Sequence, residues 1–393
     1  MGEKCAGNCI ICGKCTTASI LDAFSITGRE PQPRDGYGIA VDIGTTSVVL
    51  ALIDLAQGKT IARHSFLNPQ RAFGPDVISR IDAANKGRLT ELSQLITQSL
   101  SGGVAALLKA AGISPAQVAD MAIAGNTVMT YLLLGLPCKS LGAAPFQPEY
   151  QLAGPYEAGG LFGQSGLSCQ VRVIPWLAAY VGGDITAGLV YALPWGKGRF
   201  LLMDLGTNGE MALYDHGKLT VTATAAGPAF EQPVAAGGGS QPALQGASGV
   251  ISALAALARE GAVDEAGRLK KEGVFTQGQV RELQLAKSAI RSGVEILLEI
   301  TGLSCGDLEA VYLAGGIGQK MNPQDAVDIG LIPAELEAKS VPVGNASLGG
   351  AVAMLTAPEA FAQDTEKLLG SAQEINLAAH PRFNEYFMDY LYF

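Results

Sequence analysis

Residues 38–55, GIAVDIGTTSVVLALIDL, contain two apolar runs separated by a short polar turn. The apolar runs on both sides predict two antiparallel strands joined by that turn. The turn brings together one acid, Asp42, one glycine, Gly44, and two hydroxyl side chains, Thr45 and Thr46. Glycine lets a backbone approach a bound group, hydroxyls and amides can face phosphate oxygens, and a carboxylate can orient a hydrated divalent metal. A single such turn also fits an ordinary hairpin.

A second turn of the same design follows later in the chain. Residues 200–214, FLLMDLGTNGEMALY, again place an acid, a glycine and hydrogen-bonding side chains between two apolar runs. The counterparts of the first set are Asp204, Gly206, Thr207 and Asn208. Two acid-bearing turns predict two similar lobes that face one phosphate chain.

A third motif is a predicted strand that runs directly into two glycines and then a helix. Residues 309–322 read EAVYLAGGIGQKMN, and Gly315 and Gly316 would let a nucleoside lie against bare backbone. The three motifs, in this order, resemble the actin, sugar-kinase and chaperone ATPase superfamily (ASKHA, ribonuclease H-like). The resemblance implies a two-lobed α/β fold that binds Mg-ATP.

Three further residues are candidates for the same site. Asp184 follows Gly182 and Gly183 at the start of a predicted helix, and the superfamily resemblance implies a catalytic or metal-orienting acid there, together with Asp42 and Asp204. A plain helix cap is the alternative. Gly227 opens a glycine-rich loop that can wrap phosphate or ribose or form a lid without ligand contact. Lys287 lies on a polar stripe of a helix expected over residues 279–300, where the resemblance implies a base or ribose contact and the alternative is a solvated surface.

Four of the seven cysteines lie within eleven residues, with the spacing C-x3-C-x2-C-x2-C. They are Cys5, Cys9, Cys12 and Cys15. Thiolates this close favour one soft cation or cluster over disulfides, and the short gaps favour a 4Fe-4S cluster. A structural zinc site is the alternative. The first three also match the spacing of radical S-adenosylmethionine enzymes, but the chain does not offer the barrel of that class.

The composition fits a globular protein with substantial cores. Of 393 residues, 48% are hydrophobic and 16% charged, and the net charge of -9 argues against nucleic acid or an anionic membrane as the main partner. The sequence has neither a run long enough to span a bilayer nor the apolar segment of a signal peptide, so we expect a cytoplasmic protein.

The chain divides into three expected parts. Residues 1–35 form the cysteine-rich segment and a linker, residues 36–190 the first lobe and residues 191–393 the second. Residues 31–36, rich in proline and polar groups, are expected to be an unpacked linker. We further predict strands near 38–43, 47–55 and 59–67, a helix over 88–111, and an aromatic tail, residues 380–393, docked on a lobe. Asp76 and Arg80, one helical turn apart, fit a surface ion pair and a ligand role equally well.

Several longer strings narrow the resemblance, among them LNPQRAFGPDVISRI, AIAGNTVMTYLLLG, MDLGTNGEMAL and LAGGIGQKMNPQDAVDIGLIP. From residue 36 onward the chain is similar to the ATPase domain of reductive activators of corrinoid proteins. The resemblance implies an ATPase that passes an electron from a low-potential donor, through an iron-sulfur cluster, to the cob(II)alamin of a corrinoid methyl-carrier protein, with a homodimer as a possible assembly. The front end departs from this family: well-known activators carry a 2Fe-2S ferredoxin domain before the ATPase, whereas four cysteines in a short segment suit a 4Fe-4S cluster.

Two alternatives stay open. One is a small-molecule kinase or nucleotide sensor of the same fold with a structural zinc segment. The other is an ATP-driven electron activator of another low-potential enzyme, of the kind that activates 2-hydroxyacyl-CoA dehydratases.

Overall fold

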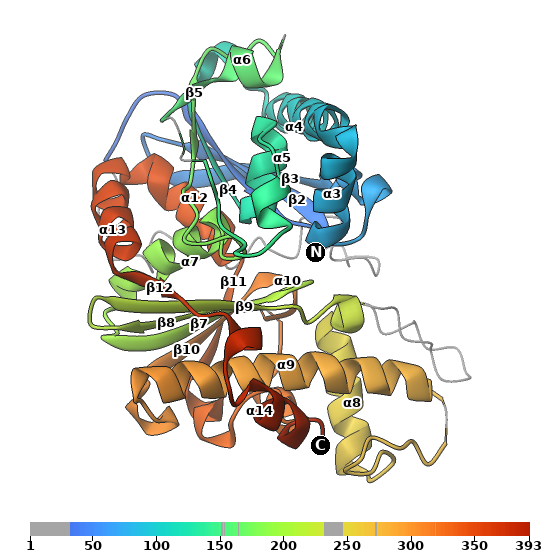
Figure 1. Cartoon of the computed structure of the whole chain (residues 1–393). Helices are drawn as coiled ribbons and strands as arrows, with labels where there is room; N and C mark the ends of the chain where they lie inside the picture. Colours follow the sequence, from blue (N-terminus) through green and yellow to red (C-terminus); the bar gives the residue numbers. More distant parts are fainter. Residues whose placement is uncertain are drawn as a thin grey trace, which may run out of the picture. The chain divides into compact units, whose positions relative to one another are not determined.

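The computed structural model describes residues 32–150, 152, 154–163, 165–231, 247–271, 273–318 and 320–393. They form two units (Figure 1). The N-terminal unit contains the described residues up to Gly196 together with Ala346–Gly370, and the C-terminal unit contains Lys197–Asn345 and Ser371–Phe393. The expected boundary near residue 190 lies close to this division, but the sequence did not indicate that the chain returns to the N-terminal unit after residue 345.

The N-terminal unit is built on a six-stranded sheet with the order β3-β2-β1-β4-β6-β5. The strands are β1 (Tyr37–Ile43), β2 (Ser47–Asp54), β3 (Lys59–Leu67), β4 (Val118–Gly125), β5 (Tyr156–Glu157) and β6 (Gln170–Val173). β1 and β2 are antiparallel, as predicted, and β3 is antiparallel to β2, while β4 is parallel to β1 and β6 parallel to β4.

The alternation of β1 decides which face of the sheet each side chain reaches. Ile39, Val41 and Ile43 belong to the core formed with α3 (Val77–Ala83), α4 (Leu89–Ala111) and α5 (Thr127–Leu134). Gly38 and Asp42 lie on the opposite face, against α12 (Ala346–Thr356), which packs on α7 (Gly183–Ala192). α4 confirms the predicted helix over residues 88–111.

Helices α7 and α12 pack closely because small residues line their contact. A Cβ added to Gly350 would lie 2.2 Å from the carbonyl oxygen of Ala187, and one added to Gly349 would meet the ring of Tyr191 at 2.8 Å. Since the first obstacle is backbone, only glycine fits at position 350 at this spacing.

The C-terminal unit repeats the same strand order around β7. Its six-stranded sheet has the order β11-β10-β7-β8-β9-β12. The strands are β7 (Arg199–Leu205), β8 (Gly209–Asp215), β9 (Lys218–Thr224), β10 (Ala310–Ala314), β11 (Ser340–Gly344) and β12 (Ala372–Glu374). The helices include α8 (Ala247–Arg259), α9 (Gln277–Thr301), α10 (Gly315–Gly318), α11 (Pro323–Asp328) and α14 (Phe383–Asp389). As in the N-terminal sheet, three antiparallel strands are followed by two parallel ones.

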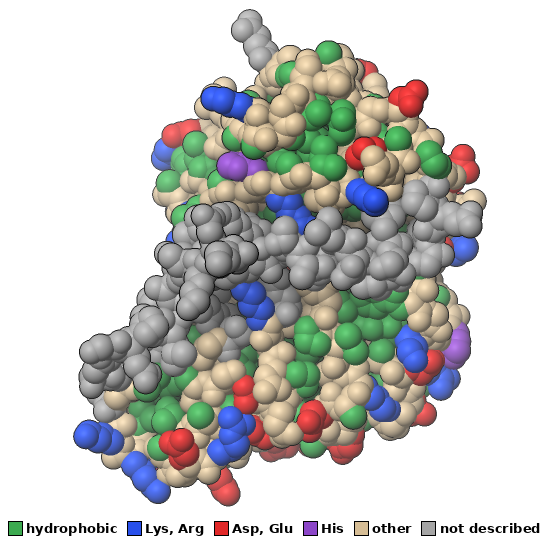
Figure 2. Space-filling model, turned by 180° about the vertical axis from the view of Figure 1, so that it is seen from behind, with side chains coloured by type: hydrophobic (Ala, Val, Ile, Leu, Met, Phe, Trp, Pro, Cys, Tyr) green, Lys and Arg blue, Asp and Glu red, His purple; other side chains and the backbone are tan. Residues whose placement is uncertain are grey.

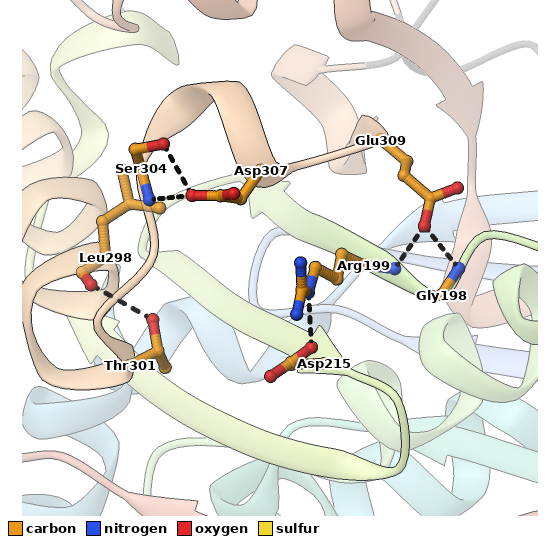
Figure 3. Close-up of polar contacts among 8 residues, drawn as sticks. All are labelled: Gly198, Arg199, Asp215, Leu298, Thr301, Ser304, Asp307 and Glu309. Carbon is orange, nitrogen blue, oxygen red and sulfur yellow. Dashed lines mark hydrogen bonds and ion pairs between the residues drawn. The ribbon is translucent and has the colours of Figure 1, made fainter.

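Hydrogen bonds at the beginning of β7 fix its register (Figure 3). The carboxylate of Glu309 accepts from the backbone amides of Gly198 and Arg199 at 2.9 and 3.0 Å. Arg199 in turn donates to Asp215 on β8 at 2.7 Å. This register carries Asp204 to the far end of β7, beside the turn.

The tail docks on α9, as predicted for residues 380–393. α14 packs along α9, and three α9 side chains donate to tail carbonyls: Gln284 to Leu391 at 2.8 Å, Lys287 to Tyr390 at 2.8 Å and to Tyr392, and Ser288 to Phe387. Lys287 is only 1% exposed, so the alternative of a solvated stripe is wrong for this residue.

The expected loose linker is fastened at residues 32–36. The amide of Gln32 donates to the carbonyl of Thr356 at 2.8 Å, and Arg34 donates to the carbonyl of Leu355 at 2.6 Å and pairs with buried Asp120 at 3.3 Å. Polar composition predicted exposure correctly for several of these residues, but it does not exclude such hydrogen bonds.

None of the helices in the described ranges combines the length and the hydropathy needed to cross a bilayer. On the face of the C-terminal unit drawn in Figure 2, acidic and basic side chains are interspersed. In the same unit, the guanidinium of Arg259 forms ion pairs with Asp325 at 2.9 Å and with Asp328.

Candidate nucleotide site

The first turn, residues 44–46, joins β1 to β2 and is held tight by its glycine. The amide of Gly44 donates to the carbonyl of Ser47 at 3.0 Å. A Cβ on Gly44 would lie 2.7 Å from that same oxygen, so a larger residue would open the turn. The glycine is therefore required by the turn itself, whether or not a ligand approaches it.

Asn126 joins the β4–α5 connection to this turn. Its side-chain oxygen caps α5 by accepting from the amide of Met129 at 2.9 Å, and its amide group donates to the hydroxyl of Thr45 at 3.1 Å. The same side chain also orients one of the hydroxyls predicted to face phosphate.

Of the two interpretations of Asp76 and Arg80, the surface ion pair is wrong. Asp76 caps α3 by accepting from the amide of Ser79 at 2.8 Å, whereas Arg80 is fully buried and donates to the carbonyl of Thr45 at 2.7 Å. The helical spacing suggested a solvated ion pair because it does not reveal what covers the helix.

Three side chains from different elements meet on the α7 and α12 face of β1. The hydroxyl of Ser347, in the first turn of α12, donates to Asp42 at 2.8 Å. Asp184 lies in the first turn of α7, as predicted, and its carboxylate accepts from the amide of Ile185 at 2.8 Å. Burial raises the pKa of Asp184 well above its usual range, and the nearby charge of Asp42 raises it further. The two carboxylates therefore lie close enough to repel each other.

The two glycines before Asp184 set the position of α7. A Cβ on Gly182 would lie 2.4 Å from the Cα of Asn126, and one on Gly183 would lie 2.3 Å from the carbonyl oxygen of Ile174. Only glycine permits this approach of α7 to the end of β4. The Gly-Gly-Asp sequence thus brings its acid beside the first turn.

The second turn, residues 206–208, repeats the first within the C-terminal unit. Asp204 is the second-last residue of β7, as Asp42 is of β1, and the amide of Gly206 donates within the turn to the carbonyl of Asn208 at 2.9 Å. Asp204 is directly paired with Glu210 across the strands, so both acids lie on one face of the sheet. The side chain of Asn208 donates to Glu210 at 3.2 Å.

The two glycines of the third motif have different surroundings. Gly315 has a positive φ of 81°, and a Cβ there would lie 2.2 Å from a carboxylate oxygen of Asp204. Around Gly316 no atom of another described segment lies within 4 Å of an added Cβ. Gly315 therefore allows the start of α10 to approach the second turn, while the bare backbone at Gly316 leaves space for a ligand.

The remaining predicted residues are placed as follows. Gly227 has a positive φ of 71° and begins a loop of which residues 232–246 lie outside the described part of the chain. The contacts of Lys287 are with the tail, and its role as a nucleoside contact stays a prediction.

Cys5, Cys9, Cys12 and Cys15 also lie outside the described residues. Within the described ranges, no group of three or more His, Cys, Asp or Glu side chains is arranged to hold a metal.

Comparison with known proteins identifies the family. The model of the RACo middle region matches residues 37–193, and that of the C-terminal domain of RACo, its ASKHA domain, matches residues 199–247 and 269–393. The corrinoid activation enzyme RamQ of Eubacterium limosum is 34% identical over 90% of this chain and 69% of its own length. The chain belongs to the RACo family of corrinoid reductive activators.

Two more relatives agree with this membership. The [Co(II) methylated amine-specific corrinoid protein] reductase of Methanosarcina barkeri is 24% identical over 79% of this chain and 68% of its own length. A solved structure of a reductive activator for a corrinoid, iron-sulfur protein matches with a TM-score of 0.81 and 29% identity, over 91% of this chain and 66% of that chain. The present chain thus spans about two thirds of the length of its RACo-family relatives, and the ASKHA fold is confirmed.

Sequence reasoning missed three residues of the site: Arg80, Ser347 and Glu210. The spacing of Arg80 left a surface pair and a ligand role equally open and did not indicate its contact with the first turn, and Ser347 lies in a helix that was expected in the other lobe. Glu210 carried the clearest signal, since it is an acid in an otherwise apolar strand directly after a turn.

Proposed function

We propose that this chain uses ATP to drive the one-electron reduction of cob(II)alamin to cob(I)alamin on a corrinoid protein. The observation that carries the proposal is the relationship to RamQ, 34% identical over 90% of this chain. The RACo-family relatives are named as activators or reductases of corrinoid proteins.

The donor set of the N-terminal unit fits Mg-ATP. Asp42 and Asp184 offer hard carboxylate oxygens, the ligands that Mg²⁺ prefers, and the electrostatic repulsion between them would be relieved by a bound cation. Thr45 and Thr46 lie in a turn shaped for phosphate oxygens. When bound, Mg²⁺ neutralises charge on the phosphate groups.

The C-terminal unit would contribute a second phosphate turn and the nucleoside contact. Asp204, Gly206, Thr207 and Asn208 are the proposed residues of the turn. Gly316 would lie against the nucleoside, because nothing occupies the space beside its backbone.

Asp184 is the proposed residue that orients the attacking water. A buried carboxylate at this position can accept a hydrogen bond from the attacking water and so orient it. Its position on the first turn of α7 is fixed by the glycines before it, which holds the acceptor oxygens in place.

The cysteine segment is proposed to carry the electron. Cys5, Cys9, Cys12 and Cys15 would bind a 4Fe-4S cluster, which is the kind of site that four closely spaced thiolates favour. One electron leaves the reduced cluster and one is gained by cobalt, and a low-potential donor then reduces the cluster again. ATP supplies the free energy that makes this transfer favourable.

The cluster is tested by anaerobic purification, iron and sulfide analysis and electron paramagnetic resonance. Cys9→Ser should lose iron and the signal, whereas Cys305→Ser, a cysteine outside the segment, should keep both. One zinc and no iron in the parent would favour the kinase or sensor alternative. Sedimentation of the same samples would test a homodimer.

The activity is tested by mixing the reduced protein, Mg-ATP and candidate corrinoid proteins while following the absorbance of cob(II)alamin. The proposal expects loss of cob(II)alamin with ATP, none with a non-hydrolysable analogue and none with Asp42→Asn. If ATP makes no difference with any corrinoid protein while the cluster is intact, another low-potential client is the better assignment.

A further inference from the structure

Every carbonyl oxygen of the first turn is bound from inside the N-terminal unit. The side-chain amide of Asn68 donates to Gly44 at 2.9 Å, and a guanidinium nitrogen of Arg80 donates to Thr45 at 2.7 Å. The backbone amide of Asn68 donates to Thr46 at 2.9 Å. Asn68 is 1% exposed and Arg80 0%, so water does not compete for these oxygens. We refer to Asn68 and Arg80 as the carbonyl clamp.

The clamp determines where the amides of the turn point. In a trans peptide the N–H is directed opposite to the C=O of the same peptide plane. Because the oxygens of Gly44 and Thr45 point inward, the amides of Thr45 and Thr46 point to the other side of the turn. Successive amides directed to one side form a concave site for an anion.

Arg80 adds a positive charge beneath this turn. Its other contacts are the carbonyl of Gly74 at 3.1 Å and the sulfur of Met129 at 3.2 Å, so all its acceptors are neutral. Asp76, on the same helix, uses its carboxylate to cap α3 through Ser79. Burial lowers the pKa of Arg80 to about 10, the charge of Arg71 adds to that shift and Asp76 acts against it, and the guanidinium is still charged at neutral pH.

A buried cation bound only to neutral acceptors is costly, and its field is weakly screened. That field favours an anion at the turn, and the hydrogen bond to Thr45 favours the backbone orientation that receives one. Charge and geometry therefore point to the same ligand chemistry, the phosphate oxygens of a nucleotide.

We propose that Arg80 and Asn68 are positioning residues for phosphate binding, which they promote by holding the carbonyls of the first turn away from the ligand. The inference rests on the proposed ATP binding and assigns the preorganisation of the turn to α3 and to the residue after β3. Neither residue contacts the nucleotide.

The test measures the affinity of Mg with a non-hydrolysable ATP analogue, and that of adenosine, by calorimetry on the full chain. Arg80→Met is the main variant, and Arg71→Met removes the same charge from an exposed site nearby. Arg80→Met should weaken the ATP analogue at least about tenfold, the range for losing a hydrogen bond from a charged group, while adenosine stays within about twofold. Arg71→Met should bind like the parent.

Arg80→Lys separates the contribution of the positive charge from that of the hydrogen bond to Thr45, because lysine keeps the charge and lacks the guanidinium group that makes this hydrogen bond. It should recover part of the lost affinity, and it carries the test if Arg80→Met does not fold. Equal affinity of parent and folded Arg80 variants for the ATP analogue would overturn the inference, as would an equal loss for adenosine. A parent that binds no ATP analogue would instead contradict the proposed function.

Discussion

The close packing of α7 on α12 predicts a large penalty for a single methyl group. Replacing Gly350 by alanine puts a Cβ 2.2 Å from the carbonyl oxygen and 2.4 Å from the carbonyl carbon of Ala187. These atoms are backbone, so no side-chain rotation can relieve the overlap. The two helices would have to separate by about 1 Å to restore ordinary contact, at a cost of about 1 to 3 kcal/mol, the usual range for overpacking.

Gly102→Ala is the matched control. Gly102 is an exposed position inside α4, with nothing within 4 Å of an added Cβ. At that position alanine has a higher helix propensity than glycine, so Gly102→Ala should raise the free energy of unfolding by about 1 kcal/mol. The two variants should therefore differ by about 2 to 4 kcal/mol in the free energy of unfolding.

Tryptophan fluorescence in urea suits this measurement. The two tryptophans of the chain, Trp176 and Trp195, both belong to the N-terminal unit. Gly350→Ala should also weaken binding of the ATP analogue, because α7 carries Asp184 and α12 carries Ser347. If Gly350→Ala were as stable as Gly102→Ala, the reasoning from the α7–α12 contact would be refuted.

Three more predictions concern buried charges and α12. Burial lowers the pKa of Lys287 to about 7. Between pH 7 and 9 the unfolded chain therefore binds more protons at this lysine than the folded chain, and the free energy of unfolding of the parent should rise by about 2 kcal/mol over that range. Lys287→Met should lose this gain in urea unfolding followed by circular dichroism, whereas exposed Lys109→Met should keep it. The raised pKa of Asp184 has the opposite effect, because the folded chain then binds more protons than the unfolded chain. The stability of the N-terminal unit should fall as the pH rises from the usual aspartate range to neutral. Asp184→Asn should reduce that fall between pH 5 and 8 and should also weaken Mg-ATP binding. Helix α12 contacts Asp42 through Ser347 at one end and Arg34 through the carbonyl of Leu355 at the other. Mg-ATP should therefore change hydrogen exchange at the amide of Arg34 in the parent but not in Ser347→Ala, and an equal response in both proteins would contradict coupling through α12.

Local patterns in the sequence predicted the elements well. The β1–β2 hairpin follows from alternation around a short turn, and α9 follows from its apolar stripe, although the structure extends this helix to Gln277–Thr301. Asp42 and Asp204 were found because each acid immediately precedes a glycine turn. Such signals depend on neighbours in the chain, which the sequence displays directly.

Burial by distant segments could not be predicted in this way. Arg80 and Lys287 each stand at helical spacing with other polar residues, which is typical of a solvated face. Arg80 is buried where its guanidinium donates to the carbonyl of Thr45 in the first turn, and Lys287 is buried where the C-terminal tail packs over it. In the same way, the place of α12 in the N-terminal unit depends on Gly350 meeting Ala187, a contact between residues far apart in sequence.

The position of α12 connects the two proposed activities within one unit. Its first turn donates from Ser347 to Asp42, and its last carbonyls, those of Leu355 and Thr356, hold Arg34 and Gln32. A helix of 11 residues is about 16 Å long, so these contacts lie at opposite ends of one buried rod. A cation bound to the carboxylate of Asp42 would weaken the hydrogen bond that this carboxylate accepts from Ser347. Because close-packed helices move as units rather than deform, a shift of α12 would also move the carbonyls that bind Gln32 and Arg34. Under the proposed function, nucleotide binding thus alters the hydrogen bonds of Gln32 and Arg34, described residues that follow the four cysteines in the sequence.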